Sequence, residues 1–279
     1  MPRIMSEAIQ LQRIEINGPR SGPHLLITGG VHGDEFESMA AIRRLQNAVS
    51  DKDLRGRLTL VPVVNEAAFR NGDRTADDGL DLARVCPGDP DGSVTQRTAV
   101  ALSTLIRSAD CYIDLHSGGN IMDVWPMSGY GLCDDLQRLE IQRRMARAMN
   151  LPVIWGSCGK LEGRSLSVAR DAGVAAIYTE YLGSGRCSSE GVEAYVEGCL
   201  NVMSELQMLD RQQPESRVRL VVEDPRHGSG HMQAQNPSPI TGQFTPAVTL
   251  GQSIAPGDLL GHVCNIVGDD TREIISTQA

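Results

Sequence analysis

Short apolar runs alternate with longer amphipathic stretches through the first 210 residues of the chain. The apolar runs are typical of strands that are buried on one or both faces. They are HLLIT (24–28), LTLVPVV (58–64), CYIDLH (111–116), LPVIW (151–155) and GVAAIYTEY (173–181). Between them, apolar residues recur at helical spacing in 34–49, 94–109, 134–149 and 188–209. This alternation predicts an α/β domain built on a mostly parallel sheet.

The pattern changes after the polar stretch LDRQQPES (209–216). Residues 216–279 carry short strand-like pieces, many glycines and prolines, and no helical period. We therefore predict two domains, an α/β domain over 1–213 and a small all-β domain over 214–279. The second resembles a barrel-sandwich fold of the biotinyl or lipoyl type, and a truncated form is one interpretation because the chain stops at Ala279.

A carrier domain of the biotinyl or lipoyl type needs a lysine that can be modified. No lysine follows Lys160, so a carrier function is excluded on chemical grounds. We expect the small domain either to cover the mouth of an active site or to form a contact in a homo-oligomer.

Composition narrows the class of protein further. The 279 residues are 41% hydrophobic and 22% charged, which is ordinary for a globular protein. A net charge of −9 and only two lysines argue against a nucleic-acid partner, because phosphates demand a basic surface. No apolar stretch approaches the roughly 20 residues of a membrane span, and the N-terminus lacks the apolar core of a leader, so we expect no membrane partner and a cytoplasmic location. Seven cysteines without a C-x-x-C pair indicate free thiols.

A glycine-rich turn, ITGGVHGDEFES (27–38), joins the first of these strands to the first helix. His32 and Glu35 have H-x-x-E spacing in this turn, and ligands bind at the carboxyl ends of strands in open α/β sheets. Catalytic zinc is commonly held by three protein ligands, and two histidines with one glutamate are a known set. His116 ends the strand CYIDLH just before two glycines, so it is the candidate for the missing ligand.

Other readings of the histidines remain open. An H-x-x-E pair often arises by chance on the surface of a helix, and a glycine-rich turn can simply connect two elements. His227 and His231, in HGSGH, form a competing pair, although their glycine-rich surroundings favour a surface loop. His24 and His262 have no partners in sequence, and we interpret them as structural.

Four motifs follow one another along the chain: GGVHGDE (29–35), DGLDLARVCPGD (78–89), DLHSGG (114–119) and YTEYLGSG (178–185). The combination resembles the succinylglutamate desuccinylase and aspartoacylase family, which is related in fold to the zinc carboxypeptidases. The resemblance covers roughly residues 22–279. It implies a three-layer α/β/α catalytic domain with a mixed sheet, followed by a small β domain. It also implies one zinc ion per chain and amidohydrolase chemistry on N-acyl amino acids.

The resemblance also implies a role for each matching residue. The zinc ligands are His32, Glu35 and His116, and Asp81 is the acid that hydrogen-bonds the first histidine. The catalytic carboxylate is Glu180. Arg74 polarises the scissile carbonyl, and Arg84 binds the substrate carboxylate. Arg70 is a near competitor of Arg74 and a candidate substrate contact. Arg164 and Ser165, in LEGRSLS, either contact substrate or begin a helix.

Two positions depart from the family pattern. Ala83 stands where the usual DLNR has an asparagine, and its methyl group cannot hydrogen-bond a substrate carboxylate. Cys86 replaces the aromatic residue of the usual RxFPG. Either the substrate carboxylate is held differently, or the substrate has none at that place. Arg84 has a further alternative, because it is near Asp77, Asp78 and Asp81 in sequence and could form a surface ion pair.

These residues predict a zinc-dependent hydrolase of linear amides that removes the acyl group from a small N-acyl amino acid or a related amide. Glu180 would act as general base and then as general acid. The alternatives are a carboxypeptidase-like peptidase with an open groove and a non-catalytic binding protein of the same fold. A serine esterase is disfavoured, because G-x-S-x-G is absent and the serine of DLHSGG adjoins His116.

Overall fold

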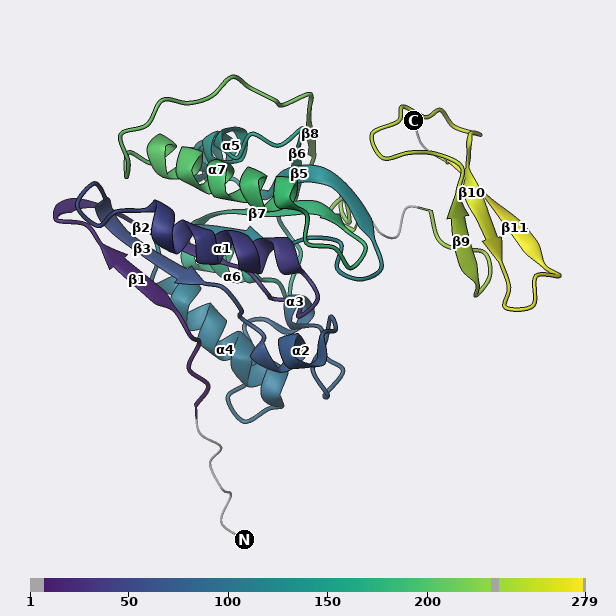
Figure 1. Ribbon diagram of the computed structural model, residues 1–279, viewed down its shortest axis with the longest axis horizontal. Coiled ribbons are helices and arrows are strands. Elements are labelled where there is room, and N and C mark those ends of the chain that lie inside the picture. The colour runs from purple at the N-terminus through teal and green to yellow at the C-terminus, as the bar shows by residue number, and fades with distance from the viewer. Residues whose placement is uncertain (1–7, 232–235, 278–279) are drawn as a thin grey trace, which may run out of the picture. The chain divides into compact units, whose positions relative to one another are not determined.

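A computed structural model describes residues 8–231 and 236–277 of the chain (Figure 1). The chain divides into two compact units, residues 1–227 and 228–279. Every residue with a predicted catalytic or binding role lies in the first unit. No helix within the described ranges is long and apolar enough to cross a membrane.

An eight-stranded mixed sheet forms the centre of the first unit. Its strands are β1 (Ile14–Asn17), β2 (Arg20–Thr28), β3 (Arg55–Val61), β4 (Cys111–Leu115), β5 (Asp123–Leu132), β6 (Val153–Cys158), β7 (Ala175–Gly183) and β8 (Leu220–Asp224). They lie in the order β1-β3-β2-β4-β7-β5-β6-β8. Strands β3, β2, β4 and β7 are parallel, whereas β1 pairs antiparallel with β3 and β5 pairs antiparallel with β7. The mixed sheet that the family resemblance implies is confirmed.

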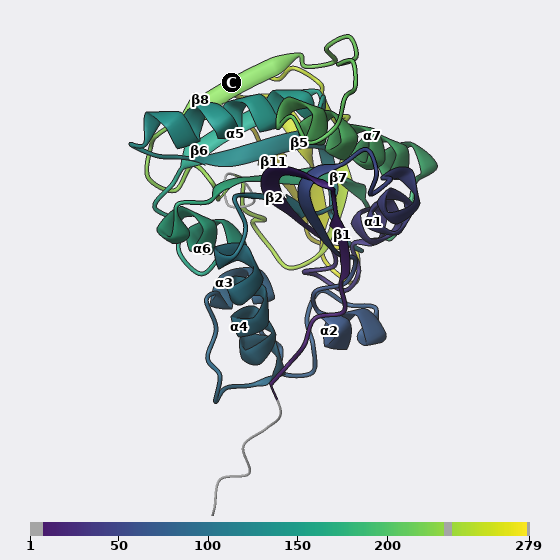
Figure 2. The same ribbon diagram turned by 90° about the vertical axis from the view of Figure 1, so that its left-hand side faces the viewer.

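Helices cover both faces of this sheet and make the first unit a three-layer domain (Figure 2). One face carries α1 (Phe36–Ala48), α5 (Leu136–Ala148) and α7 (Ser189–Glu205), and the other carries α3 (Leu82–Val85), α4 (Val94–Arg107) and α6 (Ser165–Ala172). The short α2 (Glu66–Asn71) follows β3. Side chains alternate along a strand, so Leu25 and Ile27 pack in the first core while Leu26 packs in the second.

The apolar runs and amphipathic stretches form the strands and helices predicted for them. The pattern misses β5, DVWPMSGYGL, because its proline and two glycines imitate a loop. The structure accommodates Pro126 at a shift of register between Val124 and Met127, where β5 departs from regular pairing with β7. This strand matters for the site because it borders β7.

The predicted boundary at residue 213 differs from the division in the structure. β8 pairs in parallel with β6 and so becomes an edge strand of the large sheet. Glu223 in β8 accepts hydrogen bonds from Tyr130 of β5 and Arg143 of α5. Residues 214–227 therefore belong with the large domain, and the chain divides after His227. The short run LVVED is not recognisable as part of that sheet because it follows a polar stretch without helical period.

A three-stranded antiparallel sheet forms the second unit, with β10 (Leu259–Cys264) between β9 (Gln243–Pro246) and β11 (Thr271–Ile275). The small all-β domain predicted from the sequence is confirmed to this extent. Its description as a barrel sandwich, and its role as a cover or an oligomer contact, stay predictions.

Candidate metal centre

The turn after β2 carries His32 and Glu35, and its glycines let it approach neighbouring backbone closely. Gly30 has a φ of +61°, a left-handed conformation that favours glycine. At Gly33, a Cβ atom would lie 2.1 Å from the carbonyl carbon of Ala68 in α2, so no larger residue fits. Glu35 occupies the N-cap position of α1. Backbone conformation and close packing thus explain why the turn contains glycines. They do not explain why it contains a histidine.

His116 follows β4, which lies next to β2 in the sheet. The two strands are parallel, so their carboxyl ends meet at the same edge. Backbone contacts fix the histidine there. Its N–H donates to the carbonyl of Thr179 at 2.9 Å, and the hydroxyl of Tyr195 donates to its carbonyl.

Glu35 lies between the imidazoles of His32 and His116. Its Oε1 atom is 2.7 Å from Nδ1 of His32, and its Oε2 atom is 2.8 Å from Nδ1 of His116. The ring centroids are 5.1 Å apart, and one ligand atom from each of the three residues lies within 4.8 Å of the others. All three residues are buried. The structure therefore brings together the three side chains predicted to share one ion.

Each imidazole meets a second carboxylate through its other nitrogen. Nε2 of His32 is 3.0 Å from Oδ1 of Asp81, the partner predicted from the sequence. Nε2 of His116 is 3.2 Å from Oδ2 of Asp114, which sequence reasoning missed. The signal was a charged residue inside the buried run CYIDLH, two positions before the histidine. Such outer carboxylates fix the tautomer and orientation of a metal-binding histidine.

The charges around these residues suit a divalent cation. Burial lowers the pKa of His116, but Asp114 and Glu35 outweigh burial and hold it well above its usual range. For His32, burial is again outweighed by Glu35 and Asp81, and its pKa is raised. Burial raises the pKa of Glu35, yet the two imidazoles bring it down to about 2. Three carboxylates, those of Glu35, Asp81 and Asp114, thus surround two imidazoles. Their negative charge favours the binding of positive charge at this place, either protons or a metal ion.

Glu180 lies in β7, the strand next to β4. Its Oε2 atom is buried and has no hydrogen-bond partner within residues 8–231 and 236–277. Burial is the main cause that raises the pKa of Glu180 to about 8, and Glu35 adds to the shift while His116 opposes it. A carboxyl that titrates near neutral pH is suited to proton transfer.

Arg74 and Arg70, the two candidates for polarising the scissile carbonyl, differ in their contacts. Nε and Nη2 of Arg74 donate to Oδ2 of Asp81 at 3.2 and 3.0 Å, and its Nη1 is 3.9 Å from Oε1 of Glu35. Arg70 is exposed on α2 and pairs with Glu66 at 3.4 Å. Arg74 thus lies beside the candidate metal ligands, whereas Arg70 forms a surface ion pair, and its substrate contact stays a prediction.

Arg84 and Arg164 come from two segments that pack together. A Cβ atom on Gly163 would lie 2.3 Å from the carbonyl oxygen of Arg84, and the carbonyl of Gly163 accepts a hydrogen bond from the N–H of Cys86 at 3.0 Å. Arg164 is partly buried at the N-cap position of α6. Burial and the positive charge of Arg84 lower the pKa of Arg164. Arg164 therefore begins a helix, and its contact with substrate stays a prediction.

Arg84 itself is exposed, and its Nη1 donates to the carbonyl of Ala83. Nearby aspartates are engaged elsewhere. Asp78 accepts hydrogen bonds from the backbone and hydroxyl of Thr95, and Asp77 accepts one from Asn71. In the described part of the chain Arg84 forms no ion pair with these aspartates.

The remaining histidines lie outside the candidate metal centre. Among the described residues, His32, Glu35 and His116 are the one group with the spacing to hold an ion, so the competing pair His227 and His231 does not form such a site. Buried His24 lies 2.8 Å from the carbonyl oxygen of Ser108 and 2.9 Å from the hydroxyl of Thr59, as a structural residue would. His262 lies in β10, 3.8 Å from a carboxylate oxygen of Glu273.

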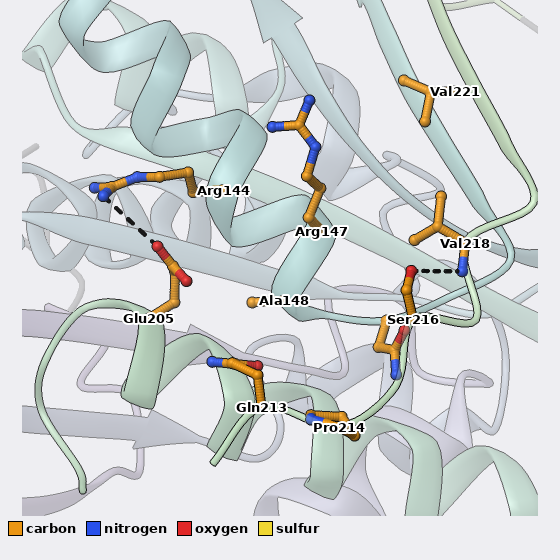
Figure 3. A pocket seen from close by; sticks show the side chains of 10 residues that line it. Arg144, Arg147, Ala148, Glu205, Gln213, Pro214, Ser216, Val218 and Val221 are labelled. Atoms are coloured by element: carbon orange, nitrogen blue, oxygen red, sulfur yellow. Dashed lines mark hydrogen bonds and ion pairs between the residues drawn. The ribbon is translucent and has the colours of Figure 1, made fainter. Parts of the chain in front are cut away.

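A separate hollow lies beside α5 and α7 (Figure 3). It has a volume of about 500 Å³ and is lined by Arg144, Arg147, Ala148, Asn150, Glu205, Gln213, Pro214, Ser216, Val218 and Val221. Arg144 and Glu205 form an ion pair of 3.6 Å beside it. None of the predicted site residues lines this hollow, so it takes no part in the chemistry considered below.

Known proteins are similar to this chain in sequence. A family model described as the succinylglutamate desuccinylase/aspartoacylase catalytic domain matches residues 21–206. An N-alpha-acetyl-L-2,4-diaminobutyric acid deacetylase from Halomonas elongata is 31% identical over 253 residues, which cover 87% of this chain and 70% of the relative.

Solved structures share the fold. A succinylglutamate desuccinylase/aspartoacylase from Rhodobacter sphaeroides has a TM-score of 0.85 and 26% identity, with 97% of this chain and 82% of that chain covered. The product-bound ectoine utilization protein EutE (DoeB) from Ruegeria pomeroyi has a TM-score of 0.86 and 29% identity, with 96% and 81% covered. On its sequence, its motifs and its fold, the chain belongs to the succinylglutamate desuccinylase/aspartoacylase family.

Proposed function

We propose that this protein is a zinc-dependent deacylase that hydrolyses the amide bond of a small N-acyl amino acid. The observation that carries the proposal is the convergence of His32, Glu35 and His116 in the domain that also buries the carboxyl of Glu180. Two histidines and one glutamate are a ligand set of catalytic zinc. Zinc held by these residues would supply a positive charge that lowers the pKa of water and polarises a carbonyl group.

The relatives support an N-acyl amino acid as substrate. The Halomonas elongata relative is named as a deacetylase of an acetylated diaminobutyric acid. We infer that this chain removes an acetyl or similarly short acyl group from an amino acid of comparable size. The peptidase alternative would instead require dipeptides to be the better substrates.

Glu180 has the role of moving a proton. Burial raises its pKa to about 8, which is close to neutral pH. The carboxyl can therefore both accept and release a proton near neutral pH. It accepts a proton from the attacking water and delivers it to the nitrogen of the leaving amine. Its Oε2 atom, which has no partner among the described residues, is the acceptor available for this task.

Arg74 has the role of stabilising negative charge on the amide oxygen. Two hydrogen bonds to Asp81 hold its guanidinium, and Asp81 also contacts His32. The arginine is thus fixed relative to the metal ligands before substrate binds. A donor prepared in this way is typically worth about 10²–10³ in rate.

Arg84 and Arg164 have the role of binding the substrate carboxylate. Their positive charges are close enough for Arg84 to lower the pKa of Arg164 in addition to the effect of burial. Guanidinium groups bind carboxylates through paired N–H donors. A second arginine offers an answer to the missing asparagine at Ala83, because it supplies donors that a methyl group cannot.

Metal content and hydrolysis, measured on the same preparation, test the proposal. We expect about one zinc ion per chain and the highest kcat/KM on N-acetyl amino acids, compared with N-succinyl amino acids, dipeptides and neutral amides. The variant Glu180→Gln should keep its zinc and lose nearly all turnover, whereas His32→Ala should lose both. Activity that survives removal of the metal, or near wild-type turnover in Glu180→Gln, contradicts the mechanism. A preference for dipeptides would favour the peptidase alternative.

A further inference from the structure

Tyr178 precedes Glu180 by two residues in β7, so both side chains project from the same face of the sheet. The strand register places Tyr178 opposite Gly129 of β5, and Gly129 opposite Trp155 of β6. Glycine therefore separates two aromatic residues in one row across the sheet. On the same face of β7, the next side chain towards the carboxyl end of the strand is that of Glu180, which lies opposite Met127 of β5.

The ring of Tyr178 occupies the space above Gly129. A Cβ atom on Gly129 would lie 2.4 Å from Cε1 of the tyrosine, 2.5 Å from Cζ and 2.7 Å from the hydroxyl oxygen. At these separations, a side chain at residue 129 would force the tyrosine ring out of its position. The ring therefore rests against the backbone of β5, and it can do so only because that position is glycine.

Tyr178 is also a neighbour of two residues with proposed roles in binding and proton transfer. Its phenol interacts electrostatically with the carboxyl of Glu180 and the guanidinium of Arg164. Burial and Glu180 raise the pKa of Tyr178 above its usual range, so the phenol is neutral at physiological pH. The side chain keeps some exposed surface, and its hydroxyl has no hydrogen-bond partner in the described residues.

The proposed function assigns these two neighbours to the two ends of the amino acid. Glu180 serves the leaving nitrogen, and Arg164 serves the carboxylate. In every α-amino acid, the Cα atom and its side chain lie between the nitrogen and the carboxylate. The phenol of Tyr178 interacts electrostatically with both Glu180 and Arg164, which favours a position beside the side chain of the leaving amino acid.

We propose that Tyr178 is a specificity-determining residue, whose ring over Gly129 limits the leaving amino acid to a short side chain. This inference rests on the proposed function and names the substrate class of the same site. N-acyl derivatives of amino acids with short side chains fit beside the ring, whereas long or aromatic side chains meet it. The free hydroxyl adds a hydrogen-bonding group for a short polar side chain.

Three proteins and four substrates test the proposal: the wild type, Tyr178→Ala and Tyr178→Phe, each with the N-acetyl derivatives of alanine, 2,4-diaminobutyrate, leucine and phenylalanine. The wild type should prefer the two shorter substrates. Tyr178→Ala should raise kcat/KM for the leucine and phenylalanine derivatives, relative to alanine, by about 10–100-fold, which lies within the range for a single methylene group in a hydrophobic pocket. Tyr178→Phe keeps the ring and should keep the ranking of alanine, leucine and phenylalanine.

The outcomes separate this proposal from the one on which it rests. A wild type that hydrolyses no N-acyl amino acid contradicts the proposed function. A wild type that hydrolyses them, together with a zinc-loaded Tyr178→Ala whose ranking is unchanged, contradicts the role of Tyr178 alone. Should Tyr178→Ala not fold, Tyr178→Val offers the same test with a residue suited to a strand. An unchanged ranking in that variant overturns the proposal as well.

Discussion

The Oδ2 atom of Asp114 lies 3.2 Å from Nε2 of His116, while Glu35 contacts Nδ1 of the same ring. The aspartate is itself held in place, since the hydroxyls of Thr28 and Ser165 donate to it at 2.9 and 2.5 Å. The histidine is thus clamped between an inner glutamate and an outer aspartate, as His32 is between Glu35 and Asp81.

Replacing the outer aspartate should weaken metal binding without removing a ligand. We expect Asp114→Asn to reduce zinc affinity by about 10–100-fold, because the imidazole loses the carboxylate that fixes its orientation. Competition against a chelator of known affinity measures the change. Asp110→Asn is the matched control, since Asp110 stands just before the same strand and accepts a bond from the N–H of His24. Equal affinity in folded Asp114→Asn and Asp110→Asn would contradict the assigned role.

The metal-free protein should become more stable when Glu180 loses its charge. The folded pKa is about 8 and the ordinary glutamate value is 4.5, so the folded state binds the proton more tightly than the unfolded state. Stability from this group is fully present below the unfolded value and is lost as pH rises towards 8. In Glu180→Gln this loss disappears. We expect its Tm to exceed that of the wild type by a margin that grows between pH 5 and 8.

Thermal unfolding in the presence of a chelator measures this margin. It should reach at least about 3 °C at pH 8, because 1 kcal/mol corresponds to roughly 2–4 °C in a domain of this size. If the difference in Tm between Glu180→Gln and the wild type were constant from pH 5 to 8, the carboxyl of Glu180 would not titrate in this pH range.

The two competing arginines should separate clearly in kinetics. We expect Arg74→Ala to lower kcat by about 10²–10³, because the amide oxygen loses a fixed positive donor. Arg70→Ala should leave kcat within about 2-fold of the wild type, since an exposed ion pair with Glu66 contributes little. Steady-state rates on one N-acetyl amino acid decide the matter. The reverse order of effects would reassign the role to Arg70.

Restoring the family asparagine should help only substrates that carry a carboxylate. In Ala83→Asn the backbone N–H can still donate to Asp81, so the start of α3 is preserved. We expect KM for an N-acetyl amino acid to fall by about 10–150-fold, because a hydrogen bond to a charged group contributes roughly 1.5–3 kcal/mol. The corresponding amino-acid amide serves as the control and should show no change. An equal effect on both substrates would place the carboxylate away from residue 83.

The sequence predicts the central strands and the cluster of His32, Glu35 and His116 because each rests on a local signal. His32 and His116 both follow apolar runs and stand beside glycines, which marks the ends of strands. The parallel pairing of β2 and β4 then brings those ends together. Asp81 could be recognised only through the family motif, because nothing in its local pattern points to a histidine.

Other features depend on contacts that no local pattern reveals. Asp114 looks like a polar interruption of a strand until His116 is placed beside it. Gly129 looks like a strand breaker, yet it is the space into which Tyr178 fits. The different surroundings of Arg70 and Arg74 also could not be read from the sequence, since both lie near the same motif and only the path of the chain after α2 separates them.

The attachment of β8 to the large sheet has a practical consequence for anyone who truncates this chain. An expression fragment that stops at residue 213 would leave the backbone groups of β6 unpaired along one side and invite edge-to-edge aggregation. It would also deprive Tyr130 and Arg143 of Glu223, their shared acceptor. A soluble fragment should therefore run at least to His227.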